Sequence, residues 1–294
     1  MSHDLLDLIG NTPLVRSRVL NPNKKVSLYF KMEGHNPGGS VKDRAAYNMI
    51  KSGLDRGEIT KDTSLIEATS GNTGIALAMI AGIFGLKMEL VMPENATKER
   101  VQTMRAYGAE VILTPADVGI EGARDYAEQK VREKGYRMLN QFGNDDNWKA
   151  HYKTTGPEIW QDTEGTVTHF VSSMGTTGTI MGTSTFLKEK NPEIQIVGVQ
   201  PTDNSSIPGI RKWPPEYLPS IFDPAKVDQV MEVSEAEAAD MARLLAREEG
   251  IFSGMSSGGA ATAALRLAAS LEEGVIVSIV CDRGDRYLSS ALFD

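Results

Sequence analysis

Four short runs of small and hydroxyl-bearing residues stand where apolar strands or loops pass into helical patterns. The first, Gly38–Arg44, contains Lys42 and has Asp43 three residues after Ser40, which resembles a capping box. We therefore expect a helix to begin here, with Lys42 in its first turn. The positive end of a helix disfavours an ammonium group, lowers the lysine pKa and favours the neutral amine that Schiff-base formation needs. An ordinary solvated lysine explains this motif equally well.

The second run, Glu67–Gly74, reads Glu-Ala-Thr-Ser-Gly-Asn-Thr-Gly between a strand pattern and an apolar helix pattern. Hydroxyls, an amide and backbone N–H groups at a helix start are suited to an anion, here a carboxylate. Thr69, Ser70, Asn72 and Thr73 are more polar groups than a capped turn requires, so binding is favoured over a purely structural turn.

The third run is Gly175-Thr176-Thr177-Gly178-Thr179, directly after a strand pattern. Glycines let backbone N–H groups form a nest and threonines add donors, which suits a phosphate, although such turns also serve as plain helix starts. The run is neither a Walker loop nor a dinucleotide fingerprint. In the fourth run, Gly254–Gly259, we expect one of Ser256 and Ser257 to cap a helix and the other to face a ligand.

The elements that must position these runs alternate along the chain. Short apolar, β-branched runs predict parallel strands covered on both faces, at residues 26–31, 64–67, 87–92, 110–113, 169–172, 195–200 and 275–280. Helical patterns lie at residues 41–56, 73–84, 98–107, 120–134, 176–190, 236–249 and 258–271. This alternation predicts an α/β doubly wound fold, which binds ligands at the carboxyl ends of its strands. The proline-rich segment 207–224 is expected to be an ordered surface loop, either functional or a plain connection.

Composition excludes several other classes of function. The 294 residues include 39 acidic and 31 basic side chains, so the net charge of −8 argues against a nucleic-acid surface. Cys281, the only cysteine, ends an apolar strand pattern and is expected to be a buried structural thiol in a cytoplasmic protein. The histidines lack metal-ligand spacing, a Gly-x-Ser-x-Gly motif is missing, and we expect neither a signal peptide nor a membrane span.

Taken together, these runs closely resemble the cysteine synthases, the O-acetylserine sulfhydrylases among the fold-type II pyridoxal-phosphate enzymes. The resemblance extends almost end to end, from Ile9–Val15 through Thr154–Trp160 to Asp285–Ser289. Within the family the chain is similar to the B isozyme, on Gly-Thr-Thr-Gly-Thr in the third run and Cys-Asp-Arg-Gly-Asp at residues 281–285. Asn144–Asn147 lacks the family's usual proline after the first asparagine; we expect a turn there and no loss of activity.

The resemblance implies two doubly wound α/β lobes (a tryptophan synthase β-like fold) with pyridoxal 5'-phosphate in the cleft between them. The larger lobe, residues 1–34 with 145–294, would carry the phosphate turn. The smaller, mobile lobe, residues 35–144, would carry the lysine and the loop for the substrate carboxylate. The resemblance also implies a homodimer in the cytoplasm.

By the same resemblance, each singled-out residue has a role. Lys42 would hold the cofactor as a Schiff base and act as general base, and Asn72 would hydrogen-bond its ring hydroxyl. The turn from Gly175 to Thr179 would bind the phosphate, and Ser256 would face the pyridine nitrogen. The substrate carboxylate would be bound by the remaining residues of the second run with Gln141 nearby, namely Thr69, Ser70, Gly71 and Thr73.

The implied reaction is a β-replacement, in which sulfide or thiosulfate displaces acetate from O-acetyl-L-serine and yields L-cysteine or S-sulfocysteine. Thiosulfate is a bulkier anion than sulfide and needs a cation or donors near the site; Arg211 in the proline-rich segment is our candidate, although a solvated surface arginine fits nearly as well. A related pyridoxal-phosphate enzyme, such as a serine/threonine dehydratase or a cystathionine β-synthase, is the alternative. A catalytically silent protein of this fold fits poorly, because Lys42, Asn72 and the phosphate turn are all intact.

Overall fold

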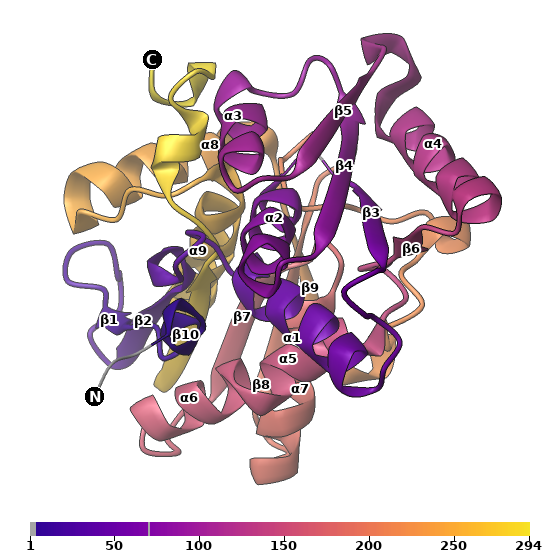
Figure 1. Cartoon of the computed structure of the whole chain (residues 1–294). Helices are drawn as coiled ribbons and strands as arrows, with labels where there is room; N and C mark the ends of the chain where they lie inside the picture. Colours follow the sequence, from indigo (N-terminus) through magenta and orange to yellow (C-terminus); the bar gives the residue numbers. More distant parts are fainter. Residues whose placement is uncertain (1–3, 70) are drawn as a thin grey trace. The chain divides into compact units, whose positions relative to one another are not determined.

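The computed structural model describes residues 4–69 and 71–294, and the chain divides into two compact units. The large unit comprises the chain up to Val41 together with Trp148–Asp294, and the small unit is Lys42–Asn147 (Figure 1). The lobe boundaries expected from the sequence, after residues 34 and 144, precede these divisions by seven and three residues. Within the part of the chain that is described, no helix combines the length and the apolar character needed to cross a membrane.

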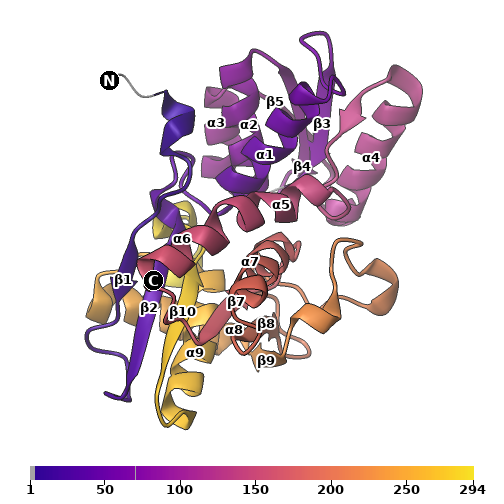
Figure 2. The same cartoon turned by 90° about the horizontal axis from the view of Figure 1, so that it is seen from below.

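The small unit is built on a parallel sheet with strand order β5-β4-β3-β6. Its strands are β3 (Ser64–Ala68), β4 (Lys87–Pro93), β5 (Glu110–Thr114) and β6 (Arg137–Met138). Its helices are α1 (Lys42–Asp55), α2 (Asn72–Phe84), α3 (Lys98–Ala106) and α4 (Gly119–Lys134). Ile66 and Val91 pack against Ala123 and Ala127 of α4 on one face of the sheet. Helices α1, α2 and α3 lie on the other side (Figure 2).

The large unit contains a sheet with strand order β1-β2-β10-β7-β8-β9, parallel except for the β1–β2 pair. Its strands are β1 (Leu14–Arg16), β2 (Val26–Met32), β7 (His169–Ser173), β8 (Gln195–Pro201), β9 (Gln229–Val233) and β10 (Gly274–Val280). Its helices are α6 (Thr155–Asp162), α7 (Gly178–Lys190), α8 (Glu235–Leu244, continued by a π-helical turn, Leu245–Glu249) and α9 (Met255–Ser270). Helix α5 (Asp145–Lys153) spans the division between the two units.

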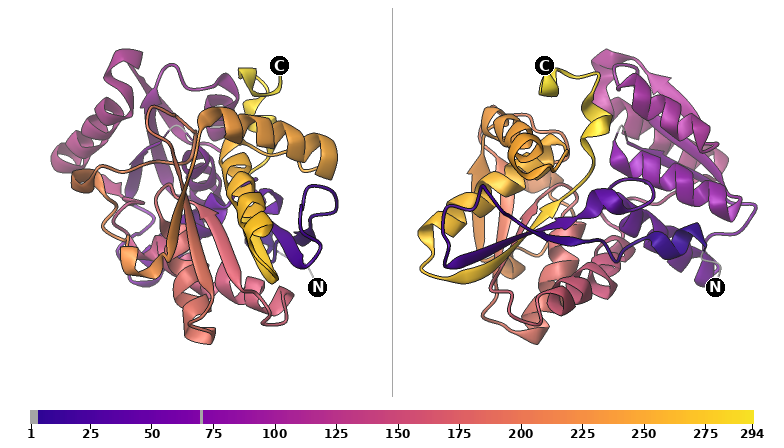
Figure 3. Two further views of the ribbon diagram at one scale, coloured as in Figure 1. Left: turned by 180° about the vertical axis from the view of Figure 1, so that it is seen from behind. Right: turned by 90° about the vertical axis from the view of Figure 1, so that its left-hand side faces the viewer.

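Two apolar cores cover the two faces of the large sheet. Along β10, Ile276 and Val280 join the core that includes α8 and α9, whereas Val277 and Ile279 join the core that includes α6 and α7. Helices α8 and α9 lie together against one face of the sheet (Figure 3). The strands are therefore apolar on both faces because helices cover both, as parallel strands in a doubly wound fold require.

Each strand and helix predicted from the sequence is present, with the strand ends displaced by at most one residue. The prediction missed β1, β6, β9, α5 and α6. The expected turn at Asn144–Asn147 is wrong, because α5 begins at Asp145. Asn144 accepts the Asp146 N–H at 3.0 Å, and an aspartate in the first turn suits the positive helix end. Proline is also favoured at a first helical position, which explains how the two residue types can interchange there.

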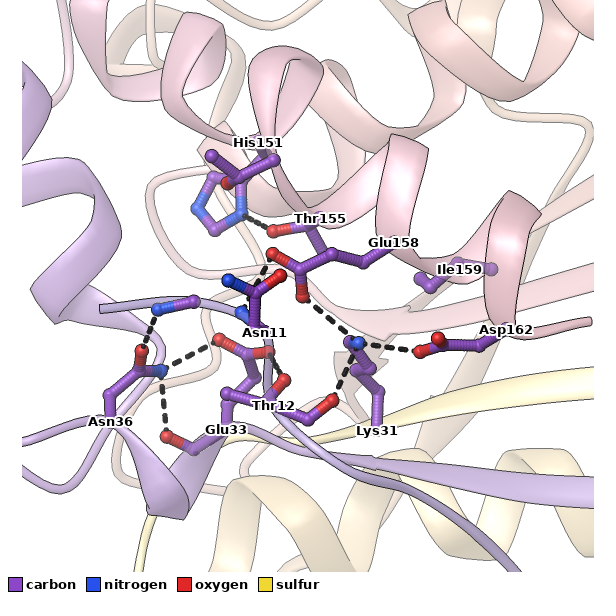
Figure 4. A network of polar contacts seen from close by, with 12 residues as sticks. Asn11, Thr12, Lys31, Glu33, Asn36, His151, Thr155, Glu158, Ile159 and Asp162 are labelled. Carbon is purple, nitrogen blue, oxygen red and sulfur yellow. Dashed lines mark hydrogen bonds and ion pairs between the residues drawn. The ribbon is translucent and has the colours of Figure 1, made fainter. Parts of the chain in front are cut away.

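A buried polar network ties the N-terminal segment of the large unit to α6 (Figure 4). Lys31 of β2 is fully buried, and its Nζ donates to the Thr12 carbonyl oxygen at 2.7 Å. The same ammonium pairs with Glu158 at 2.9 Å and with Asp162 at 3.0 Å. The Thr12 hydroxyl in turn donates to the buried Glu33 carboxylate at 2.7 Å. Burial of the Lys31 charge is thus offset by two carboxylates and a carbonyl.

Candidate active site

Lys42 is the first residue of α1 and is half-buried. The prediction that a helix begins in this run, with Lys42 in its first turn, is confirmed. Ser40, however, lies two residues before the helix, so Val41 and not Ser40 directly precedes the first helical residue. The α1 terminus places the lysine at the positive end of the helix dipole, which disfavours an ammonium group.

The second run connects β3 to α2 in the small unit. Thr69 is buried, and its N–H donates to the Val91 carbonyl at 3.0 Å, which continues the β3–β4 pairing beyond the strand end. Gly71 is the N-cap of α2, and no side chain caps the helix from that position. The Thr69 hydroxyl instead accepts the Gly71 N–H at 3.4 Å. Ser70, predicted to bind the carboxylate, lies outside the described residues.

The structure brings Gln141 to the start of α2. Thr73, in the first turn of that helix, donates from its hydroxyl to Gln141 Oε1 at 2.8 Å, and both side chains are buried. The Gln141 carbonyl oxygen accepts from Asn147 Nδ2 at 2.7 Å. Two residues that are distant in sequence and were assigned to the same group of the substrate are therefore in direct contact in the small unit.

Glu67 was not predicted as a site residue, yet it supports this arrangement. Its carboxylate is buried at the end of β3 and accepts the Asn140 N–H at 3.0 Å. Asn140 is in the left-handed region, with φ of 52°, and directly precedes Gln141. Burial raises the pKa of Glu67 to about 7, while the hydrogen bond from Asn140 and the charge of Arg124 oppose that rise. Sequence reasoning could have noticed that Glu67 is an acidic residue inside an otherwise apolar parallel strand.

The predicted phosphate turn joins β7 to α7 in the large unit. Thr177 is the N-cap of α7 and has left-handed backbone angles, with φ of 69° and ψ of −2°. This conformation is rare for a β-branched residue and is strained by about 1–3 kcal/mol. The Thr177 hydroxyl is buried and has no hydrogen-bond partner among the described residues. The positive φ at the start of the helix therefore falls on a threonine.

The proline-rich segment lies against this turn. The Arg211 N–H donates to the Met174 carbonyl at 2.9 Å, and Trp213 Nε1 donates to the Gly175 carbonyl at 2.8 Å. A Cβ at Gly175 would lie 2.6 Å from the Gly209 carbonyl oxygen, so only glycine fits there. The Arg211 side chain is exposed, with its guanidinium 5.5 Å from the centre of the Trp213 ring. Arg211 is thus held beside the phosphate turn by its backbone.

Ser256 lies in the first turn of α9 and is buried. Its carbonyl oxygen accepts from the Ser173 hydroxyl at 2.7 Å, which links α9 to the end of β7. The expectation that one of the serines caps the helix is wrong, because Gly254 is the N-cap. Its N–H is bound by the Asp282 carboxylate at 3.1 Å, and a Cβ there would lie 2.4 Å from the Tyr287 ring. Ser257 accepts the N–H of Cys281 at 2.9 Å.

From the sequence, His151 was predicted only not to be a metal ligand, and Cys281 was predicted to be a buried thiol. His151 is buried in α5, and its ring bridges the Thr155 hydroxyl at 2.8 Å and the Thr179 hydroxyl at 3.3 Å. It therefore supports the last threonine of the phosphate turn, which no spacing in the sequence indicated. Cys281 is half-buried, so its predicted full burial is wrong: it lies one residue beyond β10, where the apolar cover of the strand ends.

These residues fit the groups of pyridoxal 5'-phosphate. An unsatisfied buried hydroxyl costs about 1–3 kcal/mol, and a phosphate oxygen beside Thr177 would remove that cost. The backbone N–H groups at the start of α7 suit a dianion. The buried hydroxyl of Ser256 can donate to, or accept from, a ring nitrogen.

An α/β chain with a lysine at one helix start and an anion-adapted turn at another is the arrangement expected of a pyridoxal-phosphate enzyme. The chain belongs to the pyridoxal-phosphate dependent enzyme family, whose model matches residues 5–282. The prediction of the family and of the cofactor is thereby confirmed.

Similar proteins extend over nearly the whole chain. It is 59% identical to cysteine synthase B of Pseudomonas aeruginosa over 99% of this chain and 97% of that protein. It is 55% identical to cysteine synthase B of Escherichia coli, over 97% and 94% of the two chains. Among solved structures, the cysteine synthase of Entamoeba histolytica has a TM-score of 0.95 and 37% identity, covering 100% of this chain and 91% of that one. An O-ureido-L-serine synthase has a TM-score of 0.94 and 36% identity, covering 100% and 96%.

Proposed function

We propose that this chain is a cysteine synthase, which replaces the acetate of O-acetyl-L-serine by sulfide to give L-cysteine or by thiosulfate to give S-sulfocysteine. The observation that carries the proposal is the near full-length similarity to proteins named cysteine synthase B. A solved relative of similar fold is described as an O-acetylserine sulfhydrylase, which supports the same substrate.

The residues of the four runs would hold the cofactor. Lys42 would bind it covalently and Asn72 would meet its ring hydroxyl. Gly175–Thr179 would hold the phosphate and Ser256 would face the ring nitrogen. When bound, pyridoxal 5'-phosphate supplies an electron sink that acidifies the α-carbon of an amino acid. A serine hydroxyl is neutral, so unlike an aspartate it does not force a proton onto the ring nitrogen.

The substrate carboxylate would bind at the start of α2. Because the Thr73 hydroxyl donates to Gln141 Oε1, the Gln141 amide N–H group is the donor that remains to meet the carboxylate. Thr69, Ser70 and the backbone at Gly71 would complete this site, where the positive helix end favours an anion.

Lys42 would move the proton. Its neutral amine takes the α-proton, acetate leaves the β-carbon with the electron pair of the C–O bond, and the sulfur nucleophile supplies the pair for the new C–S bond. The Lys42 ammonium then returns the proton to the α-carbon. A helix start is suited to this role because it keeps the amine from being held permanently as a cation.

The decisive experiment is nucleophile competition on the purified, cofactor-loaded protein. We expect O-acetyl-L-serine to change the visible absorption of the cofactor, and sulfide and thiosulfate to give L-cysteine and S-sulfocysteine. Release of a keto acid from serine or threonine, without either product, would instead identify a dehydratase. Formation of cystathionine from homocysteine would identify the second alternative.

Arg211 would favour thiosulfate, because its backbone is held beside the phosphate turn and its exposed guanidinium can meet a second anionic group. We expect Arg211→Ala to lower kcat/KM for thiosulfate by roughly tenfold and to leave sulfide nearly unchanged, as one charged hydrogen bond predicts. Lys212→Ala is the matched control, because Lys212 is also exposed but is paired with Asp203 and Glu232. An equal loss with both nucleophiles would reject the specific role of Arg211.

The family resemblance also supports a homodimer. The single cysteine supports a location in the reducing cytoplasm. Sedimentation of the purified chain tests the dimer, and a monomer at micromolar concentration would exclude it.

A further inference from the structure

A buried carboxylate, that of Glu67, binds the residue that directly precedes Gln141. Glu67 precedes the last residue of β3, and its Oε2 accepts the Asn140 N–H at 3.0 Å. Asn140 comes two residues after β6, the short strand that pairs with β3. Asn140 has a positive φ and directly precedes Gln141. The hydrogen bond to Glu67 therefore holds a residue in the left-handed region immediately before Gln141.

Gln141 is thereby held from three sides. Glu67 holds the preceding residue, the Thr73 hydroxyl holds the side-chain oxygen, and Asn147 holds the main-chain oxygen at 2.7 Å. These contacts all lie within the small unit. They leave the amide N–H group of Gln141 with one defined direction, which is what a binding group needs to keep its orientation.

A glutamate is a costly choice for this position. Burial raises the pKa of Glu67 to about 7, so the carboxylate is disfavoured in the folded chain; Arg124 of α4 is the charged group that opposes the rise. A glutamine has nearly the same shape and would accept the same N–H without a charge. A residue that lowers stability where a neutral substitute fits is typical of functional sites. The gain from the charge is a stronger hydrogen bond to the Asn140 N–H.

We propose that Glu67 is a positioning residue: its carboxylate fixes the Asn140–Gln141 segment and so orients the Gln141 amide toward the substrate carboxylate. This role rests on the proposed function, because it assumes an amino-acid substrate bound at the start of α2. Glu67 does not itself touch the substrate in this role.

The test compares Glu67→Ala, which removes the acceptor, with Glu67→Gln, which keeps the acceptor and removes the charge. The matched control is Glu89→Gln on the neighbouring strand β4: Glu89 is also buried, with 7% exposure against 3% for Glu67, but it binds Tyr136 and Lys130. Two quantities are measured: hydrogen exchange at the Asn140 amide in the cofactor-free chain, and the affinity of the cofactor-loaded protein for L-alanine. L-alanine has the carboxylate but no β leaving group, so its binding is followed from the cofactor absorption.

We expect Glu67→Ala to speed exchange at Asn140 and to weaken L-alanine binding, each by roughly tenfold, because the partly buried Asn140 N–H loses its hydrogen-bond partner. Glu67→Gln should retain most of the protection of the Asn140 amide against hydrogen exchange. The ratio of wild-type to Glu67→Gln affinity should rise between about pH 6 and pH 8, as Glu67 ionises. Glu89→Gln should stay within about twofold of wild type in both measurements, because it leaves the Asn140 hydrogen bond in place.

Two different outcomes would contradict the proposals, one the proposed function and the other only the role of Glu67. If the wild-type protein shows no spectral response to L-alanine or O-acetyl-L-serine, the proposed function fails and the role of Glu67 fails with it. If the wild type responds but Glu67→Ala leaves both exchange and affinity unchanged, only the role of Glu67 is overturned. Should Glu67→Ala not fold, a pH-independent affinity ratio for Glu67→Gln would overturn it equally.

Discussion

Replacing Glu67 by glutamine should make the protein more stable at neutral pH and leave it unchanged in acid. The side chain is buried, and its pKa rises from 4.5 to about 7 because burial disfavours the charge. A shift of one pKa unit corresponds to about 1.4 kcal/mol. The free energy of unfolding of the wild type is therefore lower by about 3 kcal/mol once the pH is high enough to ionise Glu67 in the folded state.

The direction in which stability changes with pH follows from the raised pKa of Glu67. Below pH 4.5 the carboxyl is neutral in both the folded and the unfolded chain, so its contribution to the free energy of unfolding is fully present. As the pH rises toward about 7, the unfolded chain ionises freely while the folded chain resists, and the contribution is lost. Glutamine does not titrate, and its carbonyl oxygen can still accept the Asn140 N–H. The difference between the two proteins should therefore open between pH 4.5 and pH 8.

Urea unfolding of the cofactor-free proteins, followed by far-ultraviolet circular dichroism at several pH values, measures this difference. Tryptophan fluorescence is a weaker probe, because the three tryptophans, Trp148, Trp160 and Trp213, all lie in the large unit. Glu89→Gln again serves as the control for the loss of a buried carboxylate in the same sheet. Parallel stability curves for wild type and Glu67→Gln from pH 4.5 to pH 8 would refute the reasoning.

Three further substitutions test the site and the acid stability. Thr177→Val should leave the cofactor-free protein as stable or about 1 kcal/mol more stable, since an unsatisfied hydroxyl disappears, yet weaken pyridoxal 5'-phosphate binding by tenfold or more in an absorbance titration. Gly175→Ala should cost about 1–3 kcal/mol in urea unfolding, because its Cβ would lie 2.6 Å from the Gly209 carbonyl oxygen. Burial raises the pKa of Glu249, but hydrogen bonds from Ser17 and the following N–H groups outweigh burial and lower it. Glu249→Gln should thus be less stable than wild type at pH 7, by about 1 kcal/mol, with the gap closing in urea unfolding as the pH falls below 4.5.

The fold was predictable from the sequence wherever burial on both faces gives a strand a continuous apolar run. The missed strands lack that run. In β9 most residues are exposed, β1 pairs at the edge of the sheet, and β6 has only two residues. Helix α6 contains Gly156 and Pro157 in its first turn, which hides its start from a periodicity argument. Edge strands and interrupted helices are held by their neighbours and not by their own pattern.

In the site, motifs located the backbone turns, but not the residues that support them from elsewhere in the chain. His151 reaches Thr179 from α5, and Asp282 reaches Gly254 from beyond β10. The assignment of Gln141 came from family resemblance, and its contact with Thr73 joins two residues that are 68 positions apart in the sequence. Side chains that hold a turn from a distance follow from the tertiary fold, so a single sequence contains no spacing rule for them.

Buried polar groups without partners are not by themselves signs of a binding site in this protein. The hydroxyls of Thr183 and Ser278 are also buried without a partner, in a helix and a strand of the large unit, and nothing else at those positions indicates a ligand. Thr177 differs because its unsatisfied hydroxyl coincides with a strained left-handed backbone at a helix N-cap. Two independent costs at one residue are hard to retain unless something bound there offsets both. For this reason Thr177→Val is expected to separate stability from cofactor affinity, whereas removing the Thr183 hydroxyl should change stability alone.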